Sequence, residues 1–452
     1  MLRGVAGVGK TTLMQEAVEV IEKNGTKVVT FAPSANASRG VLRSDGFKDA
    51  DTVAMLLKDE RKQEAARNGL IWIDEAGLLG SRSMASVFAL AKRINARVSL
   101  SGDRYQHDSV ERGATLRLLE EEADLKPADV KDIQRQKGDF KKAVKALSDG
   151  KVAEGFRRLN DLGWIREISG EARYKQLATD YVQAVTDRKS ALVVSPTHAE
   201  GDRITVEIRR QLREKGTLGK KDRRFRVLSN ANLTEAERGD ASNYSASDVL
   251  QFHQNAKGYR RGQRVEVSSV DSLPLDQRAR FSVFHACEIS LADGDRIRIT
   301  HNGYTADGKH RLDNGSLYQV KSFDHEGNIV LNNGWVVAKD FGHLDHGYVV
   351  TSHASQGRTV QRVFVGQGFE SLPASSREQF YVSVSRAKEQ VIVYTGNKQE
   401  LLDAVSQSDE RISATELVGT GLPPKVRETR HVPEWQIYDD RARIDRELVH
   451  ER

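Results

Sequence analysis

The stretch Gly4-Val5-Ala6-Gly7-Val8-Gly9-Lys10-Thr11 constrains the fold more than any other part of this 452-residue chain. It fits the pattern G-x-x-x-x-G-K-[ST], in which glycines let backbone amides turn inward around phosphate oxygens. An amphipathic stretch follows, so we expect a helix that begins near Lys10 and directs its positive end at the same phosphates. Lys10 is then expected to neutralise the β- and γ-phosphates of ATP, and Thr11 to offer its hydroxyl to Mg²⁺. The alternative is a chance glycine turn.

Only Met1-Leu2-Arg3 precede this loop, whereas a phosphate loop ordinarily follows a central strand of several residues. We therefore expect the first strand to be truncated, and no upstream segment is present to grip the adenine. This pattern favours the rear part of a longer protein, or a gene fragment.

Acidic side chains follow a second apolar run. Residues 70–73 (LIWI) read as a buried strand that ends in Asp74 and Glu75. A carboxylate at this sheet edge can hold Mg²⁺ through water, and a second one can orient and deprotonate the attacking water, so we assign these roles to Asp74 and Glu75 in turn. Gln106, shortly after the next strand, can sense the γ-phosphate and touch a bound polymer. The alternatives are helix capping by the acids and an ordinary loop glutamine.

The rest of the chain alternates short apolar runs with amphipathic stretches, which predicts a parallel α/β architecture. Polar residues follow several of these runs, where ligands sit in doubly wound sheets. The repetition of an apolar run, a Pro-Ser or Ser-Pro pair and a helical pattern predicts two related α/β lobes, with chance resemblance as the alternative. The predicted strands are residues 27–31, 70–73, 96–100, 191–194, 348–351 and 391–395.

Composition narrows the protein class. Hydrophobic content of 38% and charged content of 30% are typical of a globular protein with real cores. The one cysteine, Cys287, excludes internal disulfides and cysteine-based zinc sites. No signal peptide or membrane-length apolar run is seen, so we expect a cytoplasmic protein. A net charge of +6 permits a nucleic-acid partner without proving one.

The collected motifs resemble those of superfamily 1B DNA helicases of the RecD type, and in particular the helicase portion of conjugative relaxases of the TraI/TrwC (MobF) kind. The resemblance covers roughly residues 1–400. In chain order, the matching segments are Gly4 to Thr11 (motif I), Ala32-Pro33-Ser34 (Ia), Asp74-Glu75 (II), Gly102-Asp103 with Gln106 (III), Gln134-Arg135-Gln136 (IV), residues 346–359 (V) and residues 381–388, YVSVSRAK (VI). His107 departs from the family pattern, which has an apolar residue there.

The resemblance implies two RecA-like P-loop NTPase lobes with a small, SH3-like β-barrel inserted in the second lobe. Arg135 and Arg386 are then expected to reach the γ-phosphate from across the cleft; Arg386 stands in an apolar, strand-like stretch, and its alternative role is a salt bridge on a sheet edge. The expected divisions are 1–130 (first lobe), 131–190 (helical connection), 191–293 (first part of the second lobe), 294–341 (barrel-like insertion), 342–405 (second part of the second lobe) and 406–452 (polar tail).

The resemblance also implies an ATP- and Mg²⁺-dependent helicase or translocase on single-stranded DNA, moving 5′ to 3′, with other conjugation proteins as further partners. By position in the motifs, the nucleotide contacts are Gly4, Gly7, Gly9, Lys10, Thr11 and Thr12, and the DNA contacts are Ser34, Thr197, His353 and Gln356. Two basic-aromatic patches, around Phe225 and Tyr259, are either phosphate contacts or solvated loops.

Two other functions stay open at this stage. The short first strand suggests a catalytically impaired remnant that binds DNA or a conjugation partner without productive ATP turnover. A further alternative is an ATPase that acts on protein or RNA.

Overall fold

The computed structural model describes residues 1–103, 105–107, 109, 113–121, 123, 125–269 and 273–410. The chain divides into two compact units, of which the first contains residues 1–204 and the chain from 350 onward, and the second contains residues 205–349. The predicted polar tail falls almost wholly outside the described residues. No helix in these ranges has both the length and the apolar character that crossing a membrane requires.

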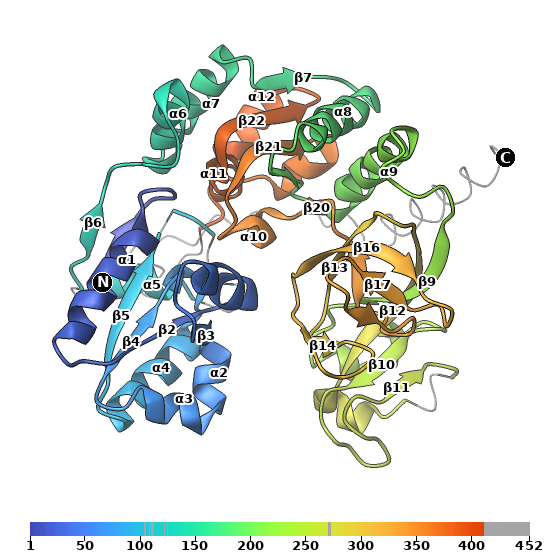
Figure 1. Ribbon diagram of the computed structural model, residues 1–452, viewed down its shortest axis with the longest axis horizontal. Helices are drawn as coiled ribbons and strands as arrows, with labels where there is room; N and C mark the ends of the chain where they lie inside the picture. The colour runs from blue at the N-terminus through green and yellow to red at the C-terminus, as the bar shows by residue number, and fades with distance from the viewer. Residues whose placement is uncertain are drawn as a thin grey trace. The chain divides into compact units, whose positions relative to one another are not determined.

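The expected parallel α/β architecture is confirmed in the first unit, which holds two sheets (Figure 1). All recorded pairings in the first sheet are parallel. Its strands, in spatial order, are β3 (Asp51–Thr52), β2 (Val28–Ala32), β4 (Leu70–Ile73), β5 (Arg97–Gly102), β1 (Leu2–Gly4) and β6 (Ala128–Val130). Its helices are α1 (Lys10–Lys23), η1 (Asn36–Leu42), α2 (Val53–Lys58), α3 (Glu60–Ala65), η2 (Ala76–Leu78), α4 (Ser81–Arg93) and α5 (Thr115–Glu121).

Strand β4 is apolar throughout because both faces of its sheet are covered. Leu70 and Trp72 pack in one buried cluster with residues of α1, and Ile71 and Ile73 pack in another with residues of α2 and α4. Figure 1 shows these helices on either side of the sheet. Because the strand is buried on both faces, the two acids that follow it, Asp74 and Glu75, lie at the edge of a well-packed core.

Strand β1 is short but occupies a central place. It has only three residues, yet it pairs with β5 on one side and with β6 on the other. The Arg3 guanidinium adds ion pairs to Asp129 and Glu120, each at 2.6 Å. The first strand is short, as expected, but it is paired on both of its sides and so anchors the phosphate loop that follows it.

The connection between the lobes is mostly helical but contributes one strand. It contains α6 (Gly138–Ser148), α7 (Val152–Asp161), β7 (Ile165–Glu167) and α8 (Ala172–Thr186). Strand β7 pairs in parallel with β22 and so becomes an edge of the second sheet. We predicted a helical connection over 131–190 and no strand there; three residues are too few to produce a readable alternation.

The second sheet belongs to the second lobe. Its strands, in spatial order, are β20 (Val349–Val350), β8 (Ala191–Val194), β21 (Val360–Gln367), β22 (Ala387–Thr395) and β7. The associated helices are α9 (His198–Glu214), α10 (Ser352–Ser355), η7 (Phe369–Ala374), α11 (Arg377–Ser385) and α12 (Lys398–Val405). Helix α11 covers the part of the strand-like stretch that precedes Arg386, so the strand reading is wrong there, whereas the part after Arg386 lies in β22. All eight residues from Glu378 to Ser385 are buried, and a segment buried on every side has no polar face to reveal a helical period.

The second unit is antiparallel. One sheet has the order β11 (Arg264–Glu266), β10 (Val249–Phe252), β12 (Phe281–Leu291) and β9 (Arg223–Asn230), and the other β18 (Val336–Val337), β17 (Ile329–Leu331), β16 (Leu317–Phe323), β13 (Arg296–Ile299) and β19 (Leu344–His346). Short elements complete it: η3 (Glu237–Gly239), η4 (Ala241–Asn243), η6 (Leu275–Arg280), β14 (Gly303–Tyr304) and β15 (Arg311–Leu312). The structure thus differs from the expected 191–293 division, because residues 223–291 pair antiparallel and do not extend the parallel sheet.

The two-sided burial of β4 gives a stability prediction. We expect Ile71→Ala to lower the free energy of unfolding by about 2–5 kcal/mol, because the substitution leaves a cavity that the surrounding packed side chains fill only in part. The control is Val20→Ala on α1, a side chain that is 58% exposed, for which we expect a change within about 0.5 kcal/mol. Urea titration followed by circular dichroism measures both; equal losses would contradict the assignment of this core.

Candidate nucleotide site

The phosphate loop joins β1 to α1 and has the conformation that its glycines permit. Gly7 and Gly9 have φ of 82° and 84°, a region that side chains larger than glycine rarely adopt. A Cβ at Gly7 would lie 2.7 Å from Cβ of Arg135, whereas one at Gly9 would meet no atom within 4 Å. Gly7 is therefore required by both conformation and packing, and the space over Gly9 is open to a ligand.

The start of α1 carries the three polar residues predicted for nucleotide binding, Lys10, Thr11 and Thr12. Lys10 Nζ donates to the carbonyl oxygens of Gly4, at 2.5 Å, and of Val5, at 3.4 Å. The ammonium group thus folds back over the loop that it is expected to serve. Carbonyl oxygens are neutral partners, so the full positive charge of Lys10 stays available to an anion that enters the loop.

Asp74 lies at the carboxyl end of β4 and is oriented by a neighbouring strand. Ser101 Oγ donates to Asp74 Oδ1 at 2.7 Å, and Trp72 Nε1 donates to the same serine oxygen at 3.1 Å. Burial, and then the charge of Glu75, raise the pKa of Asp74 to about 6. A cation would relieve this desolvated pair of acids.

The donor set fits Mg²⁺. Among the described residues, no group of three or more His, Cys, Asp or Glu side chains could hold a metal. Mg²⁺ bound with a nucleotide needs only one or two protein ligands, because phosphate oxygens and water complete its shell. Thr11 and Asp74 would supply such a set.

Glu75 has an unusual backbone conformation and a hydrogen bond from a residue distant in the sequence. Its φ of 52° lies in the left-handed region, which is uncommon for glutamate and occurs at sites where geometry is imposed. Gln356 Nε2, from the turn after α10, donates to Glu75 Oε2 at 3.2 Å. The predicted general base and a predicted DNA contact are therefore hydrogen-bonded neighbours.

The end of β5 contacts α10. Gln106 Nε2 donates to Asp103 Oδ2 at 3.0 Å, while Gln106 Oε1 is buried and has no hydrogen-bond partner among the described residues. His107 Nε2 lies 2.8 Å from Ser352 Oγ, and its ring stacks on His353 with centroids 3.5 Å apart. Burial, followed by the neighbouring His353, lowers the pKa of His107 to about 3, so this residue is a neutral packing group where the family has an apolar one.

Arg135 lies directly on the phosphate loop. Its backbone amide donates to the Gly7 carbonyl at 3.1 Å, and its Nη1 donates to the Ser385 carbonyl at 2.8 Å. The neighbouring Gln136 reaches the same Ser385 carbonyl, at 3.1 Å. Arg135 therefore contacts both the loop at the start of the chain and the end of α11.

Arg386 follows α11 and is 2% exposed. Its Nε donates to the Val382 carbonyl and its Nη2 to Ser385 Oγ, both at 2.9 Å. Within the described part of the chain it forms no ion pair, so the alternative of a sheet-edge salt bridge is wrong. Burial lowers the pKa of Arg386, and the charge of Glu75 opposes that shift. A buried cation with neutral partners is an arrangement that an anion would stabilise.

Tyr381 is the residue of this site that sequence reasoning missed. Its hydroxyl accepts from the Ala6 amide at 2.8 Å and lies 3.1 Å from Asp103 Oδ2. We read it only as part of motif VI, in the apolar run before Arg386; the sole available signal was a hydroxyl-bearing aromatic in that run. Because Ala6 and Tyr381 also share one buried apolar cluster, the phosphate loop and α11 meet at one site.

The four predicted DNA contacts differ in their exposure and in their hydrogen-bond partners. Ser34 Oγ accepts from the Ala37 amide at 3.1 Å, and Thr197 Oγ1 lies 3.0 Å from Ser371 Oγ, so each hydroxyl has a local partner. His353 is exposed on α10, where it is accessible to a polymer. Gln356 is buried against Glu75. Of the four, His353 has the surroundings of a direct contact.

The basic-aromatic patch around Phe225 does not offer an aromatic platform. Phe225 is 6% exposed and stacks on Phe323 with ring centroids 5.5 Å apart. Tyr259 stacks similarly on Phe252, at 4.3 Å. Both rings are occupied by the core of the second unit, so only the surrounding arginines and lysines remain for phosphate contacts.

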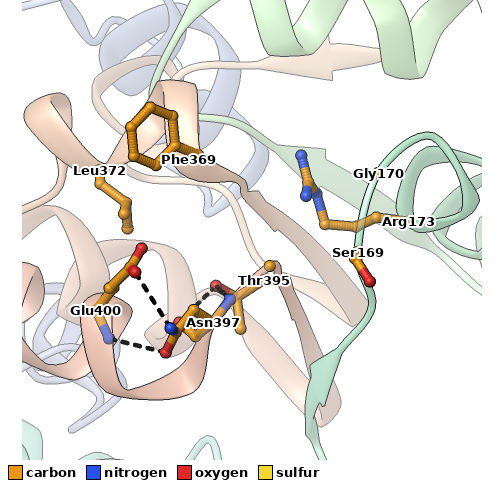
Figure 2. Close-up of a pocket in the computed structure, with 9 residues that line it drawn as sticks. Ser169, Gly170, Arg173, Phe369, Leu372, Thr395, Asn397 and Glu400 are labelled. Carbon is orange, nitrogen blue, oxygen red and sulfur yellow. Dashed lines mark hydrogen bonds between the residues drawn. The ribbon is translucent and has the colours of Figure 1, made fainter.

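A pocket of about 310 Å³ lies at the carboxyl ends of β7 and β22, away from the predicted site residues (Figure 2). Asn397 caps α12 there, accepting from the Gln399 and Glu400 amides. Arg173 and the exposed Phe369 stand across from it. The lining residues recorded for this pocket are Ser169, Gly170, Arg173, Phe369, Leu372, Thr395, Gly396, Asn397 and Glu400. It is therefore not the nucleotide site.

Two protein families match the two segments of the chain that contribute residues to the site. Residues 1–170 match the family described as AAA domain, and residues 346–394 match the UvrD-like helicase C-terminal domain. The first range contains motifs I to IV, and the second contains motifs V and VI. These matches therefore cover all the segments on which the resemblance was built.

The relatives are conjugation proteins and helicases. The multifunctional conjugation protein TraI of Escherichia coli K12 is 26% identical over 488 residues, which cover 92% of this chain and 27% of that protein. The ATP-dependent RecD2 DNA helicase of Deinococcus radiodurans is 24% identical over 403 residues, covering 86% and 46%. The chain thus spans less than half the length of these relatives.

Solved structures support the fold. The Bacteroides Pif1 helicase in complex with ADP-AlF3 and single-stranded DNA aligns with a TM-score of 0.51 at 16% identity, covering 87% of each chain. This similarity shows the RecA-like helicase architecture. Together, the two matched domain families and these relatives make the chain similar to the RecD-like helicases of superfamily 1B and to the TraI-type conjugation proteins.

Proposed function

We propose that this chain is an ATP-dependent DNA helicase or translocase that moves 5′ to 3′ along single-stranded DNA in a conjugative relaxase system. The observation that carries the proposal is the contact between the phosphate loop and α11, from the Ala6 amide to the Tyr381 hydroxyl at 2.8 Å. It brings a loop suited to a triphosphate and the buried Arg386 into one site. The relatives whose names describe conjugation proteins and a DNA helicase support the choice of polymer.

In this proposal, ATP occupies the loop from Gly4 to Thr11, with Gly7 and Gly9 exposing backbone amides to its phosphates. Lys10 turns from its carbonyl partners to the β- and γ-phosphates, and Thr12 adds a hydroxyl at the first turn of α1. Mg²⁺ held by Thr11 and Asp74 would neutralise phosphate charge. Glu75 orients the attacking water and accepts its proton, and Gln106 senses the γ-phosphate.

Arg135 and Arg386 stabilise the charge that develops on the transferred phosphoryl group. Both already lie within one hydrogen-bonded group around the Ser385 carbonyl and its hydroxyl. Burial lowers the pKa of both arginines, and the positive charge of Arg386 lowers the pKa of Arg135 further. An entering γ-phosphate would remove that repulsion, so nucleotide binding and the docking of α11 favour one another.

DNA is proposed to cross both lobes at Ser34, Thr197 and the region of α10, with His353 as the exposed contact. The other domain boundaries expected for the helicase parts remain part of this proposal, but residues 223–291 are no longer assigned to the second lobe. The five-stranded sheet from β13 to β19 is proposed as the SH3-like insertion. Its short antiparallel strands around a core that includes Ile297 and Leu331 support that assignment. Function in a conjugation complex in the cytoplasm is likewise proposed.

The competing proposal, an impaired remnant, rests on the short first strand. The pairing of β1 on both sides weakens that reason, because the phosphate loop is anchored in spite of its short strand. Titration of the chain with Mg-ATP separates the two proposals: tight binding with DNA-stimulated turnover supports the motor, and binding of DNA without turnover supports the remnant. Strand-displacement assays on DNA and RNA duplexes test the polymer, and substrates with one free end of each polarity test direction.

The first of two predictions about the nucleotide site concerns Lys10. We expect Lys10→Ala to lower DNA-stimulated ATP hydrolysis by about 100-fold or more, the effect typical of removing one charged stabilising group. The matched control is Lys23→Ala at the far end of the same helix, where the side chain is 71% exposed and pairs with Glu19. A steady-state phosphate-release assay measures both variants. Equal rates for the two variants would refute the role of Lys10.

The second prediction concerns Arg386. We expect Arg386→Ala, and Arg386→Lys, which keeps the charge but loses the planar fork, to lower kcat by about 10³- to 10⁵-fold. Binding of a labelled nucleotide is expected to persist, because the phosphate loop is unchanged. Arg377→Ala, at the other end of α11, is the control, since this arginine pairs with Glu378 and Glu410. Near-normal turnover by Arg386→Lys would contradict a transition-state role.

A further inference from the structure

One buried tyrosine connects the phosphate loop to the end of β5. The Ala6 amide donates to the Tyr381 hydroxyl at 2.8 Å, and this hydroxyl lies 3.1 Å from Asp103 Oδ2. Tyr381 is 1% exposed, so neither bond competes with bulk water. These two bonds join three segments of the chain: the loop before α1, the end of β5 and the middle of α11.

The chemistry of the donors and acceptors fixes the direction of both hydrogen bonds of Tyr381. A backbone amide can only donate, so the Tyr381 oxygen accepts from Ala6, and the one hydroxyl proton points to the Asp103 carboxylate. Burial, and then the charge of Asp103, raise the pKa of Tyr381 well above its ordinary value, so the proton stays on the tyrosine. The carboxylate therefore polarises the hydroxyl and strengthens its hold on the loop amide.

The same carboxylate is bonded to residues that lead towards α10. Asp103 Oδ2 also accepts from Gln106 Nε2 at 3.0 Å, and Asp103 Oδ1 accepts from the Tyr105 amide at 3.0 Å. His107, the residue after Gln106, lies against α10 through Ser352 and stacks on the exposed His353. A continuous set of contacts thus runs from the phosphate loop to an exposed face proposed to contact DNA.

We propose that Tyr381 is a positioning residue that couples DNA bound at α10 to the conformation of the phosphate loop. The proposal rests on the proposed function and adds a route for DNA stimulation. A polymer that shifts His107 and Gln106 alters the bonds to Asp103, and Tyr381 passes this change to the Ala6 amide. Contiguous contacts do not by themselves demonstrate coupling, so the test must measure a coupling quantity.

The test compares Tyr381→Phe with Tyr394→Phe. Tyr394 on β22 is also fully buried, and its hydroxyl donates to the Asp180 carboxylate, so both variants lose one buried phenol-to-carboxylate bond. We expect Tyr381→Phe to lower the ratio of ATPase rates with and without single-stranded DNA by about 5- to 100-fold, the range of ordinary coupling between sites. The ratio is the quantity compared, because a change in the basal rate alone cancels in it. Tyr394→Phe is expected to keep the full ratio.

The inference is overturned if both variants keep the wild-type ratio, or if Tyr381→Phe loses nucleotide binding in the absence of DNA, as a merely structural role would require. The double variant with Asp103→Asn adds a second check. If the two residues act through the same hydrogen bond, the double variant should lower the ratio of ATPase rates no further than Tyr381→Phe alone.

A binding measurement separates this inference from the proposed function. We expect ADP with aluminium fluoride to change the Kd for a labelled oligothymidylate in the wild type and in Tyr394→Phe, but not in Tyr381→Phe. A wild-type chain without DNA-stimulated hydrolysis would refute the proposed motor. A nucleotide-dependent Kd that survives in Tyr381→Phe would refute the coupling role, whatever the hydrolysis rate.

Discussion

The site depends on the packing of the phosphate loop against α11. Ala6 and Val8, from the loop, lie in the same buried apolar cluster as Phe380, Tyr381 and Val384 of that helix. The hydrogen bond from Ala6 to Tyr381 joins residues 375 positions apart in the chain. Apolar burial holds the two segments together without direction, and the hydrogen bond then fixes their alignment. Without this contact, the predicted phosphate loop and the predicted arginine would be two unrelated features.

The charges around this contact are arranged for a ligand that carries both signs. Asp74 and Glu75 supply negative charge, and burial together with the charge of Glu75 raises the pKa of Asp74. Arg135 and Arg386 supply positive charge and are bonded to neutral groups of Ser385. A complex of a divalent cation with a triphosphate would satisfy both sets at once. Such unsatisfied charge is costly to stability and is characteristic of functional sites.

The second unit interrupts the second lobe without disturbing its sheet. The chain leaves the lobe within α9 and re-enters it at β20, where the Ser195 amide donates to the Val350 carbonyl at 3.0 Å. The inserted residues build their own antiparallel sheets and their own apolar cores. Strand β20, after the insertion, is the neighbour of β8, before it, so the parallel sheet is continuous across the insertion.

Local pattern determined much of this protein. The sequence alone predicted the phosphate loop, the two acids after β4 and the bounds of β4 and β8, because these depend on glycine conformation and on short runs of apolar residues. It did not predict α11 as a helix, since a segment buried on all sides has no periodicity to read, nor β7, which is a strand only because β22 pairs with it. Tertiary structure alone decided that Tyr381 bonds to Ala6 and that Gln356 bonds to Glu75. Those contacts join residues hundreds of positions apart, and no local preference of either residue specifies its partner.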